Sequence, residues 1–275
     1  MTRQSHQIPR AGFAPDVVSR LLDDALASRG QPPVYGITGM QGSGKSTLAA
    51  QLADMAKIRG LRVVVLSIDD FYLTRRERNA LARSVHPLLR QRGPPGSHDV
   101  PLAVRLIEAL RGFQPGDCLA LPRFDKLGDC RLPPSRWPRV RQRPDLVILE
   151  GWFLKVPPEP EQSLATPLNF LEREQDAGAV WRRFCNVALA AYAPLWQRLD
   201  RLLWLRGPGF EVVPRWRWQQ ELSLQAAHPG RAGMSQAQVE RFVLLFERVS
   251  RQAQRTLGAI ADRTLTLDSE RLPGR

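Results

Sequence analysis

The chain has 275 residues, of which 43% are hydrophobic and 24% are charged, a balance that excludes a disordered, fibrous or collagen-like protein. The 40 lysines and arginines exceed the 27 acidic residues, and the formal charge of +13 is expected to attract anions such as nucleic acid, acidic membrane, or phosphorylated and carboxylated small molecules. The charge does not choose among these partners. A solvated basic surface with no specific partner explains it equally well.

The cysteines and the apolar runs indicate the compartment. Cys118, Cys130 and Cys185 are odd in number and widely spaced, so they predict neither a disulfide framework nor a C-x-x-C pair. The first 15 residues lack the apolar core of a secretory signal, and no apolar run reaches the roughly 18 residues that a membrane span needs. The sequence therefore predicts a cytoplasmic protein outside the membrane, and it leaves the oligomeric state open.

The first predicted elements alternate between helix and strand. Residues 1–32 read as a polar leader followed by a helix, which closes at Gly30. A β-rich run over residues 33–38 precedes a glycine-rich turn, and the helix behind that turn ends at Gly60. Residues 62–72 then supply a nearly continuous aliphatic strand, which is typical of a parallel sheet buried on both faces.

The rest of the chain continues this alternation around two irregular stretches. The irregular stretches are rich in proline and cover residues 86–101 and 121–144. The helices are predicted over residues 102–112, 180–199, 212–227 and 236–260, the last of them capped by Ser235, and the strands over residues 145–152, 200–207 and 263–268. No internal repeat or linker interrupts this order, which predicts a single domain over residues 1–275.

A phosphate-binding motif lies between the first predicted strand and its helix. Gly39, Gly44, Lys45 and Ser46 satisfy the pattern G-x-x-x-x-G-K-[ST]. Glycines let successive backbone N–H groups curl around phosphate oxygens, and the helix N-terminus adds partial positive charge. The alternative is a glycine turn that merely caps a helix, but the strand-loop-helix context favours a phosphate site. The predicted nucleotide-binding residues are Gly39, Gln41, Gly42, Ser43, Gly44, Lys45, Ser46 and Thr47.

The same motif suggests which nucleotide and which ion bind. Lys45 is expected to reach the β- and γ-phosphates, and the Ser46 hydroxyl is expected to ligate Mg²⁺. The guanine signature Asn-Lys-x-Asp is not matched by residues 124–127, which read Phe-Asp-Lys-Leu. The predicted cofactors are therefore ATP and Mg²⁺.

Carboxylates stand at the ends of two predicted strands. Ligands of parallel sheets lie outside the carboxyl ends of the strands, so Asp69 is expected to face the γ-phosphate and to accept a proton from an attacking hydroxyl. One of Asp69 and Asp70 would be catalytic, and the other could cap the next turn. Glu150 is placed to hold Mg²⁺ or its waters, although it could simply accept bonds from loop amides. These features predict an α/β P-loop NTPase fold, a parallel sheet flanked by helices.

Seven segments carry a resemblance to a known family. They are "GMQGSGKSTL", "LSIDDFYLT", "RGPPGSHDVPL", "PRFDK", "DLVILEGWFL", "RWRWQQE" and "AGMSQAQVERFV". In this order they resemble the plant-type D-glycerate 3-kinases and their bacterial and fungal relatives. That group is similar in turn to the uridine kinase, phosphoribulokinase and pantothenate kinase superfamily. The resemblance covers the chain from about Val34 to the C-terminus.

The resemblance implies roles for individual residues. It makes Asp69 the catalytic base, close enough to the nucleotide to join Ser46 and Glu150 around Mg²⁺. It also implies a helical lid over residues 206–233, in which Arg215 and Arg217 close over the phosphates and act as catalytic residues together with Lys45. The two arginines alternate with tryptophans, an arrangement that also suits packing or cation–π contacts. The implied acceptor-binding residues, in elaborated substrate loops, are Asp70, Tyr72, His98, Asp99, Arg123, Asp125 and Lys126.

The predicted function is transfer of the γ-phosphate of ATP to a hydroxyl of a small acceptor, which the resemblance makes D-glycerate. Such a carboxylated acceptor needs a fixed cation, which Arg123 or Lys126 could supply. Two segments depart from the family, "LGDCRLPPSRW" and "FERVSRQ", so another acceptor such as a nucleoside, pantothenate or a sugar derivative stays open. An RNA-binding P-loop NTPase is the less favoured alternative, since a nucleic-acid switch has no need of a strand-end base.

Overall fold

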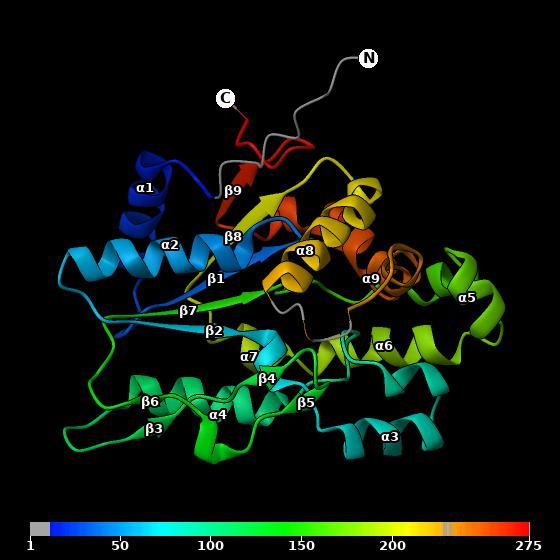
Figure 1. Cartoon of the computed structure of the whole chain (residues 1–275), viewed down its shortest axis with the longest axis horizontal. Helices are drawn as coiled ribbons and strands as arrows, with labels where there is room; N and C mark the ends of the chain where they lie inside the picture. The colour runs from blue at the N-terminus through cyan, green and yellow to red at the C-terminus, as the bar shows by residue number, and fades with distance from the viewer. Residues whose placement is uncertain (1–11, 228–229, 231–232, 275) are drawn as a thin grey trace.

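The computed structural model describes residues 12–227, 230 and 233–274. Its centre is a parallel five-stranded sheet in the order β2-β7-β1-β8-β9 (Figure 1). The strands are β1 (Val34–Gly39), β2 (Val63–Ser67), β7 (Leu146–Gly151), β8 (Arg201–Arg206) and β9 (Arg263–Thr266). The predicted α/β P-loop fold with a parallel sheet is confirmed, and all five strands lie where the sequence predicted them.

Both faces of the sheet are covered by helices, as the aliphatic strands require (Figure 1). Alternate residues of a strand point to opposite faces. In β7, Leu146 and Ile148 pack toward α1 (Pro15–Leu26) and α2 (Lys45–Ile58). Their neighbours in the strand pack in the opposite core, with the helices α4 (Val100–Arg111), α6 (Val180–Ala190), α7 (Ala193–Trp196) and α9 (Gln236–Thr256).

The predicted helices form, with three differences. The helix expected over residues 180–199 is broken into α6 and α7, because Pro194 fits only the first turn of a helix. Neither α3 (Arg75–Ser84) nor α5 (Phe170–Gln175) was predicted, because both helices are short and show no clear hydrophobic periodicity. Short 3₁₀ turns cover Ile68–Phe71, Pro87–Arg90, Pro134–Arg136, Glu161–Leu164, Phe210–Val212 and Leu257–Ala259.

The proline-rich stretch before β7 folds into two small antiparallel ribbons. One pairs β3 (Leu119–Ala120) with β6 (Arg139–Val140), and the other pairs β4 (Phe124–Asp125) with β5 (Cys130–Arg131). These strands have two residues each, which is too short for an alternating pattern in the sequence. In Figure 1 the second ribbon lies near the carboxyl end of β2.

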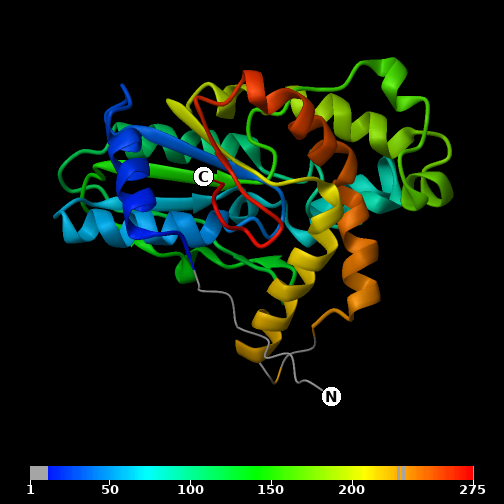
Figure 2. The same ribbon diagram turned by 90° about the horizontal axis from the view of Figure 1, so that it is seen from above.

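Helices α8 (Val213–Ala227) and α9 pack against each other and project from the body as a pair (Figure 2). The predicted cap of α9 is confirmed, because Ser235 and Gln238 form a capping box. Of the predicted lid, residues 228–229 and 231–232 lie outside the described part of the chain, as does the leader up to residue 11.

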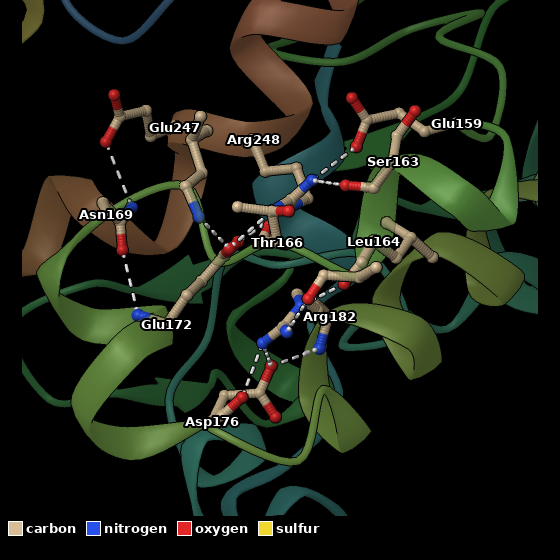
Figure 3. Close-up of polar contacts among 12 residues, drawn as sticks. Glu159, Ser163, Leu164, Thr166, Asn169, Glu172, Asp176, Arg182, Glu247 and Arg248 are labelled. Carbon is tan, nitrogen blue, oxygen red and sulfur yellow. Dashed lines mark hydrogen bonds and ion pairs between the residues drawn. The ribbon is translucent and has the colours of Figure 1, made fainter.

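A buried polar network fixes the base of α9 to the body (Figure 3). Arg248 of α9 donates to Glu172 of α5 at 2.6 Å and to Glu159 at 3.1 Å. Below it, Arg182 pairs with Asp176 at 3.0 Å, and both side chains are only 1% exposed. Breaking such a pair by removing one partner costs about 3–5 kcal/mol, since a charge is left buried and unpaired. The contacts of Arg248 therefore attach the C-terminal half of α9 to the body, while its N-terminal half extends with α8.

Two smaller observations concern the cysteines and the apolar character of the helices. Cys118, Cys130 and Cys185 are free thiols. Within the described ranges, no helix combines the length and apolar character that crossing a membrane would require.

Candidate active site

The phosphate loop joins β1 to α2 through glycines in conformations that other residues avoid. Gly42 and Gly44 have φ of +78° and +92°. A Cβ atom on Gly42 would lie 2.6 Å from Cβ of Trp216, so helix α8 packs directly on the loop at this point. The sequence requires glycine here for two reasons, the left-handed backbone and the close approach of α8.

Lys45 is folded back onto the loop it follows. Its Nζ donates to the carbonyl oxygens of Gly39 at 2.8 Å and Met40 at 2.9 Å. Burial lowers the pKa of the Lys45 ammonium, while the carboxylates of Glu150 and Asp69 act in the opposite direction. The three charged groups therefore lie close enough to influence one another electrostatically.

Polar groups of the loop fit a phosphate. The Ser43 hydroxyl and both amide atoms of Gln41 are buried, and none has a hydrogen-bond partner in the described part of the chain. Buried polar atoms without partners are rare and costly. A bound phosphate group would accept from the Ser43 hydroxyl, the Gln41 amide nitrogen and the N–H groups of the first turn of α2, where Ser46 and Thr47 are exposed.

Ser46 and Glu150 meet at the carboxyl end of the sheet. The Ser46 hydroxyl donates to Glu150 Oε1 at 3.0 Å, across the gap between α2 and the end of β7. No group of three or more acidic, histidine or cysteine side chains suited to a metal occurs among residues 12–227, 230 and 233–274. The pair nevertheless fits Mg²⁺ chemistry, because this ion binds through one or two protein oxygens and completes its shell with waters and phosphate oxygens.

Asp69 is the most strongly held carboxylate of the site. Its Oδ2 pairs with Nζ of Lys126 at 2.6 Å, and its Oδ1 accepts from the hydroxyl of Tyr72 at 2.8 Å. Burial favours the protonated carboxyl, but the Lys126 ammonium and the Tyr72 hydroxyl outweigh it and hold the pKa of Asp69 well below its ordinary value. Asp69 is therefore ionised, and its proton-accepting oxygens are fixed in place.

Asp70 has a different environment although it is the next residue. Arg123 donates to its Oδ2 at 3.2 Å, and the backbone N–H of Phe124 donates to its Oδ1 at the same distance. Burial raises the pKa of Asp70 despite these two donors. Asp70 thus connects the end of β2 to the β4–β5 ribbon, which carries Phe124.

His98 lies between two tyrosines. Its ring stacks on Tyr72 with centroids 4.4 Å apart, and its Nδ1 lies 2.7 Å from the Tyr192 hydroxyl. That hydroxyl accepts from the N–H of Gly96, and in the tautomer with the ring proton on Nε2 it donates its own proton to Nδ1. Burial lowers the pKa of His98 to about 3, so the ring is neutral at physiological pH. Its Nε2 is buried without a hydrogen-bond partner in the described residues.

Asp99 and Asp125 shape the loops around these groups. Asp99 caps α4 through a bond from the N–H of Leu102 at 3.0 Å, and its other oxygen pairs with Arg131 at 3.3 Å. Asp125 accepts from the N–H of Leu127 at 3.0 Å, which forms the turn after β4. Both therefore have a local structural role as well as a position beside the predicted acceptor residues.

Arg131 was not among the site residues predicted from the sequence. Its Nε and Nη2 donate to the carbonyl oxygen of Tyr72 at 3.1 and 2.7 Å, while its Nη1 reaches Asp99. It follows Cys130 within the segment "LGDCRLPPSRW", where the chain departs from the family it resembles. The only indication in the sequence that this segment differs was its departure from the family, and that departure did not show which side chain would point toward Tyr72 and Asp99.

Among the residues that the structure describes, no hydrogen bond or ion pair joins Arg215 or Arg217 to the phosphate loop. Arg215 pairs with Glu270 at 2.8 Å and also donates to the carbonyl of Ser269, whereas Arg217 pairs with Glu221 of its own helix at 2.9 Å. The loop is reached instead by Arg271, whose Nε donates to the carbonyl of Gly42 at 2.6 Å. The guanidinium of Arg271 also lies 5.1 Å from the ring centroid of Trp216, so the cation over this tryptophan comes from the C-terminal segment and not from the α8 arginines named in the sequence prediction.

Comparison with known proteins gives one local match and several that span most of the chain. A family model described as methylmalonyl Co-A mutase-associated GTPase MeaB matches residues 13–72, which include the phosphate loop. A protein of Schizosaccharomyces pombe named uncharacterized kinase mug58 is 34% identical over 238 residues, 83% of each chain. The chloroplastic D-glycerate 3-kinase of Arabidopsis thaliana is 32% identical over 253 residues, 86% of this chain but 52% of the plant protein, so the chain spans about half of that relative's length.

Solved structures agree with these matches. A D-glycerate 3-kinase from Cryptococcus neoformans superposes with a TM-score of 0.74 at 25% identity, over 95% of this chain and 96% of the other. The protein YGR205w superposes with a TM-score of 0.69 at 24% identity, over 96% and 97% of the two chains. The second match supports the fold alone.

Proposed function

The chain belongs to the P-loop kinase family that includes the fission yeast kinase and the D-glycerate 3-kinases, and from this premise we propose that it phosphorylates the 3-hydroxyl of D-glycerate with ATP. The observation that carries the chemistry is the ionised carboxylate of Asp69, fixed by Tyr72 and Lys126 near Lys45. A base beside a phosphate-binding lysine is the arrangement that phosphoryl transfer to a hydroxyl requires.

In the proposed reaction each side of the site has a distinct task. Lys45 leaves the carbonyls of Gly39 and Met40 and binds the β- and γ-phosphates, so its present bonds act as a resting position. Asp69 accepts the proton of the acceptor hydroxyl as that oxygen attacks phosphorus. Mg²⁺, held through Ser46 and Glu150 with Asp69 near its waters, would neutralise charge on the phosphate oxygens.

The acceptor residues are proposed from their position around Asp69. His98 would donate from Nε2–H to an acceptor oxygen, which would satisfy an otherwise unpartnered buried group. Asp99 and Asp70 would accept from acceptor hydroxyls, and Asp125 would set the turn that presents the "PRFDK" segment. Arg123 and Lys126 are the cations that the sequence singles out for a carboxylate.

We propose that α8 acts as a lid. Arg215 and Arg217 would exchange their present partners, Glu270 and Glu221, for the phosphates when nucleotide binds. An exposed pair such as Arg215 with Glu270 contributes at most about 1 kcal/mol, so a phosphate can displace it readily. Closure would exclude water and suppress simple hydrolysis of ATP.

A second acceptor class is favoured by one observation. The segment "LGDCRLPPSRW", which departs from the family, forms the turn after β4 and the strand β5, and it contacts Tyr72 and Asp99 through Arg131. A changed ribbon beside the base could change the acceptor to another small hydroxylated molecule.

The location in the cytoplasm also stays a prediction, resting on the free thiols.

The test is ATP consumption by the purified protein with Mg²⁺, in the presence and absence of D-glycerate. Nucleosides, pantothenate and other sugar acids serve as the comparison panel, and RNA is added as a separate arm. We expect D-glycerate to stimulate ATP consumption most and 3-phosphoglycerate to form. Stimulation by a different acceptor would leave the kinase chemistry in place and remove the glycerate assignment, whereas stimulation by RNA alone would favour the NTPase alternative.

A further inference from the structure

The cations on the acceptor side of the site, which comprises residues 69–72, 92–99 and 123–131, differ in how far neighbouring carboxylates neutralise their charge. Three of them have a carboxylate of their own: Lys126 with Asp69, Arg123 with Asp70, and Arg131 with Asp99. Arg92 has to share one, because Asp129 accepts from Arg92 at 2.6 Å through Oδ1 and from Arg78 at 2.9 Å through Oδ2. Two guanidinium groups therefore divide a single negative charge.

Arg78 cannot present the surplus charge to a ligand. It is fully buried, and its guanidinium also donates to the carbonyl oxygens of Leu73, Arg90 and Asp129. Every nitrogen of that guanidinium is thus committed to the protein. The charge that Asp129 leaves unbalanced is consequently presented by Arg92.

Arg92 is partly accessible and lies next to Phe124, which packs against Tyr72. Its side chain is 19% exposed, and its Nε and Nη2 donate to no acceptor in the described part of the chain. Its guanidinium lies 5.7 Å from the ring centroid of Phe124, which packs edge-on against the Tyr72 ring at 5.2 Å. Burial raises the pKa of the Tyr72 hydroxyl, and the positive charge of Arg92 opposes that increase, as expected of a cation close to Tyr72.

We propose that Arg92 is the residue that binds the anionic group of the acceptor, so that the site selects a hydroxy acid over an uncharged polyol. The inference rests on the proposed function and adds its specificity determinant. Nε and Nη2 form the fork that binds a carboxylate through two parallel hydrogen bonds. Asp129 holds the third nitrogen, Nη1, and so fixes the plane of that fork beside Phe124.

The experiment compares D-glycerate with D-glyceramide, which keeps both hydroxyls and lacks the charge. In Arg92→Gln we expect the KM for D-glycerate to rise about 10–100-fold, the value of a hydrogen bond to a charged group, with the KM for ATP unchanged. The preference for the acid over the amide should fall by the same factor. Arg92→Lys keeps the charge and loses the fork, so it should be intermediate. Arg90→Gln removes the same charge from an exposed side chain two residues away and serves as the control.

The outcomes separate this inference from the proposed function. If wild-type protein phosphorylates D-glycerate and Arg92→Gln still prefers the acid over the amide, Arg92 is not the anion site. If Arg123→Gln then loses this preference, the anion site is assigned to Arg123. If wild-type protein prefers another carboxylic acid and Arg92→Gln raises its KM, the inference stands while the glycerate assignment fails. If the preferred acceptor carries no anionic group, both are wrong. Circular dichroism of each variant confirms that the kinetic loss comes from folded protein.

Discussion

The phosphate loop and the acceptor side of the site differ in how the chain supplies their ligands. The loop draws on one continuous stretch, residues 39–47, and would bind phosphate largely with backbone N–H groups. The acceptor side gathers side chains from residues 69–72, 92–99 and 123–131, and each charged group is set by a partner from another segment. Backbone recognition tolerates changes in side chains, while the acceptor side depends on every partner. Specificity is therefore expected to change more easily than phosphate binding.

The largest effect should come from the acceptor side. Asp69→Asn removes the proposed base while keeping the shape of the side chain, and we expect kcat to fall about 10²–10⁴-fold. The affinity for ATP, measured by calorimetry, should stay within about twofold of wild type, because Asp69 lies outside the loop. A variant with near-normal kcat would show that Asp69 is not the base.

The matching change on the phosphate side should act differently. Lys45→Ala removes the cation that reaches the phosphates, and we expect kcat/KM for ATP to fall about 10²–10³-fold. Nucleotide affinity should fall with it, whereas the affinity for the acceptor should not. Steady-state kinetics in which ATP and the acceptor are varied in turn distinguish a loss of nucleotide affinity from a loss of acceptor affinity. Unchanged kinetics would contradict the assignment of the phosphate loop.

The pH dependence tests how the acceptor side holds its base. The pKa of Asp69 is lowered mainly by Lys126, so wild-type activity should persist well into the acid range. In Lys126→Met burial remains and the ammonium is gone, so the pKa of Asp69 should rise and the acid limb of kcat should move up by about 1–3 pH units. A lowered pKa of Asp69 in the folded state stabilises the fold at pH values above the pKa of the unfolded chain, and this stability is lost as the pH falls through the folded pKa. Because the folded pKa is higher in Lys126→Met, the variant should lose this stability at a higher pH than wild type. A pH–rate profile at saturating substrates measures the shift, and an unmoved acid limb would mean that another group controls it.

The smallest effect concerns His98. His98→Phe keeps the stacking ring beside Tyr72 and removes Nε2–H, and we expect the KM for the acceptor to rise about 2–10-fold, the net value of one neutral hydrogen bond. Because burial lowers the pKa of His98 to about 3, neither protein should show a limb in its pH–rate profile near the ordinary histidine value. Such a limb, present in wild type and lost in the variant, would show that the imidazole is charged in the working enzyme.

Local patterns were sufficient for several parts of the molecule. The aliphatic runs predicted all five strands of the sheet, because a strand buried on both faces has to be apolar throughout. The phosphate loop was predicted because its chemistry depends on glycines at fixed spacing, with Lys45 and Ser46 next to them. The cap of α9 at Ser235 was predicted for the same reason, since a capping box involves residues only three apart.

The acceptor side could be listed but not assembled from the sequence. The family resemblance named Asp69, Tyr72 and Lys126, yet their mutual contacts, and the opposite pKa shifts of Asp69 and Asp70, come from the fold. Arg131 was missed because it lies on a two-residue strand, which has no periodicity. The resting contacts of Arg215 and Arg217 were also unforeseen, as they involve a C-terminal turn and a helical neighbour.

The sequence by itself thus determined the sheet, the phosphate loop and the strand-end carboxylates, because each depends on residues close together along the chain. Only the tertiary structure decided which charges are balanced. Asp129, from the turn between β4 and β5, is shared by Arg78 of α3 and by Arg92, and these three residues lie far apart in the sequence. Electrostatic interactions depend on distance in space, so no local pattern could have shown that Arg92 keeps its charge available.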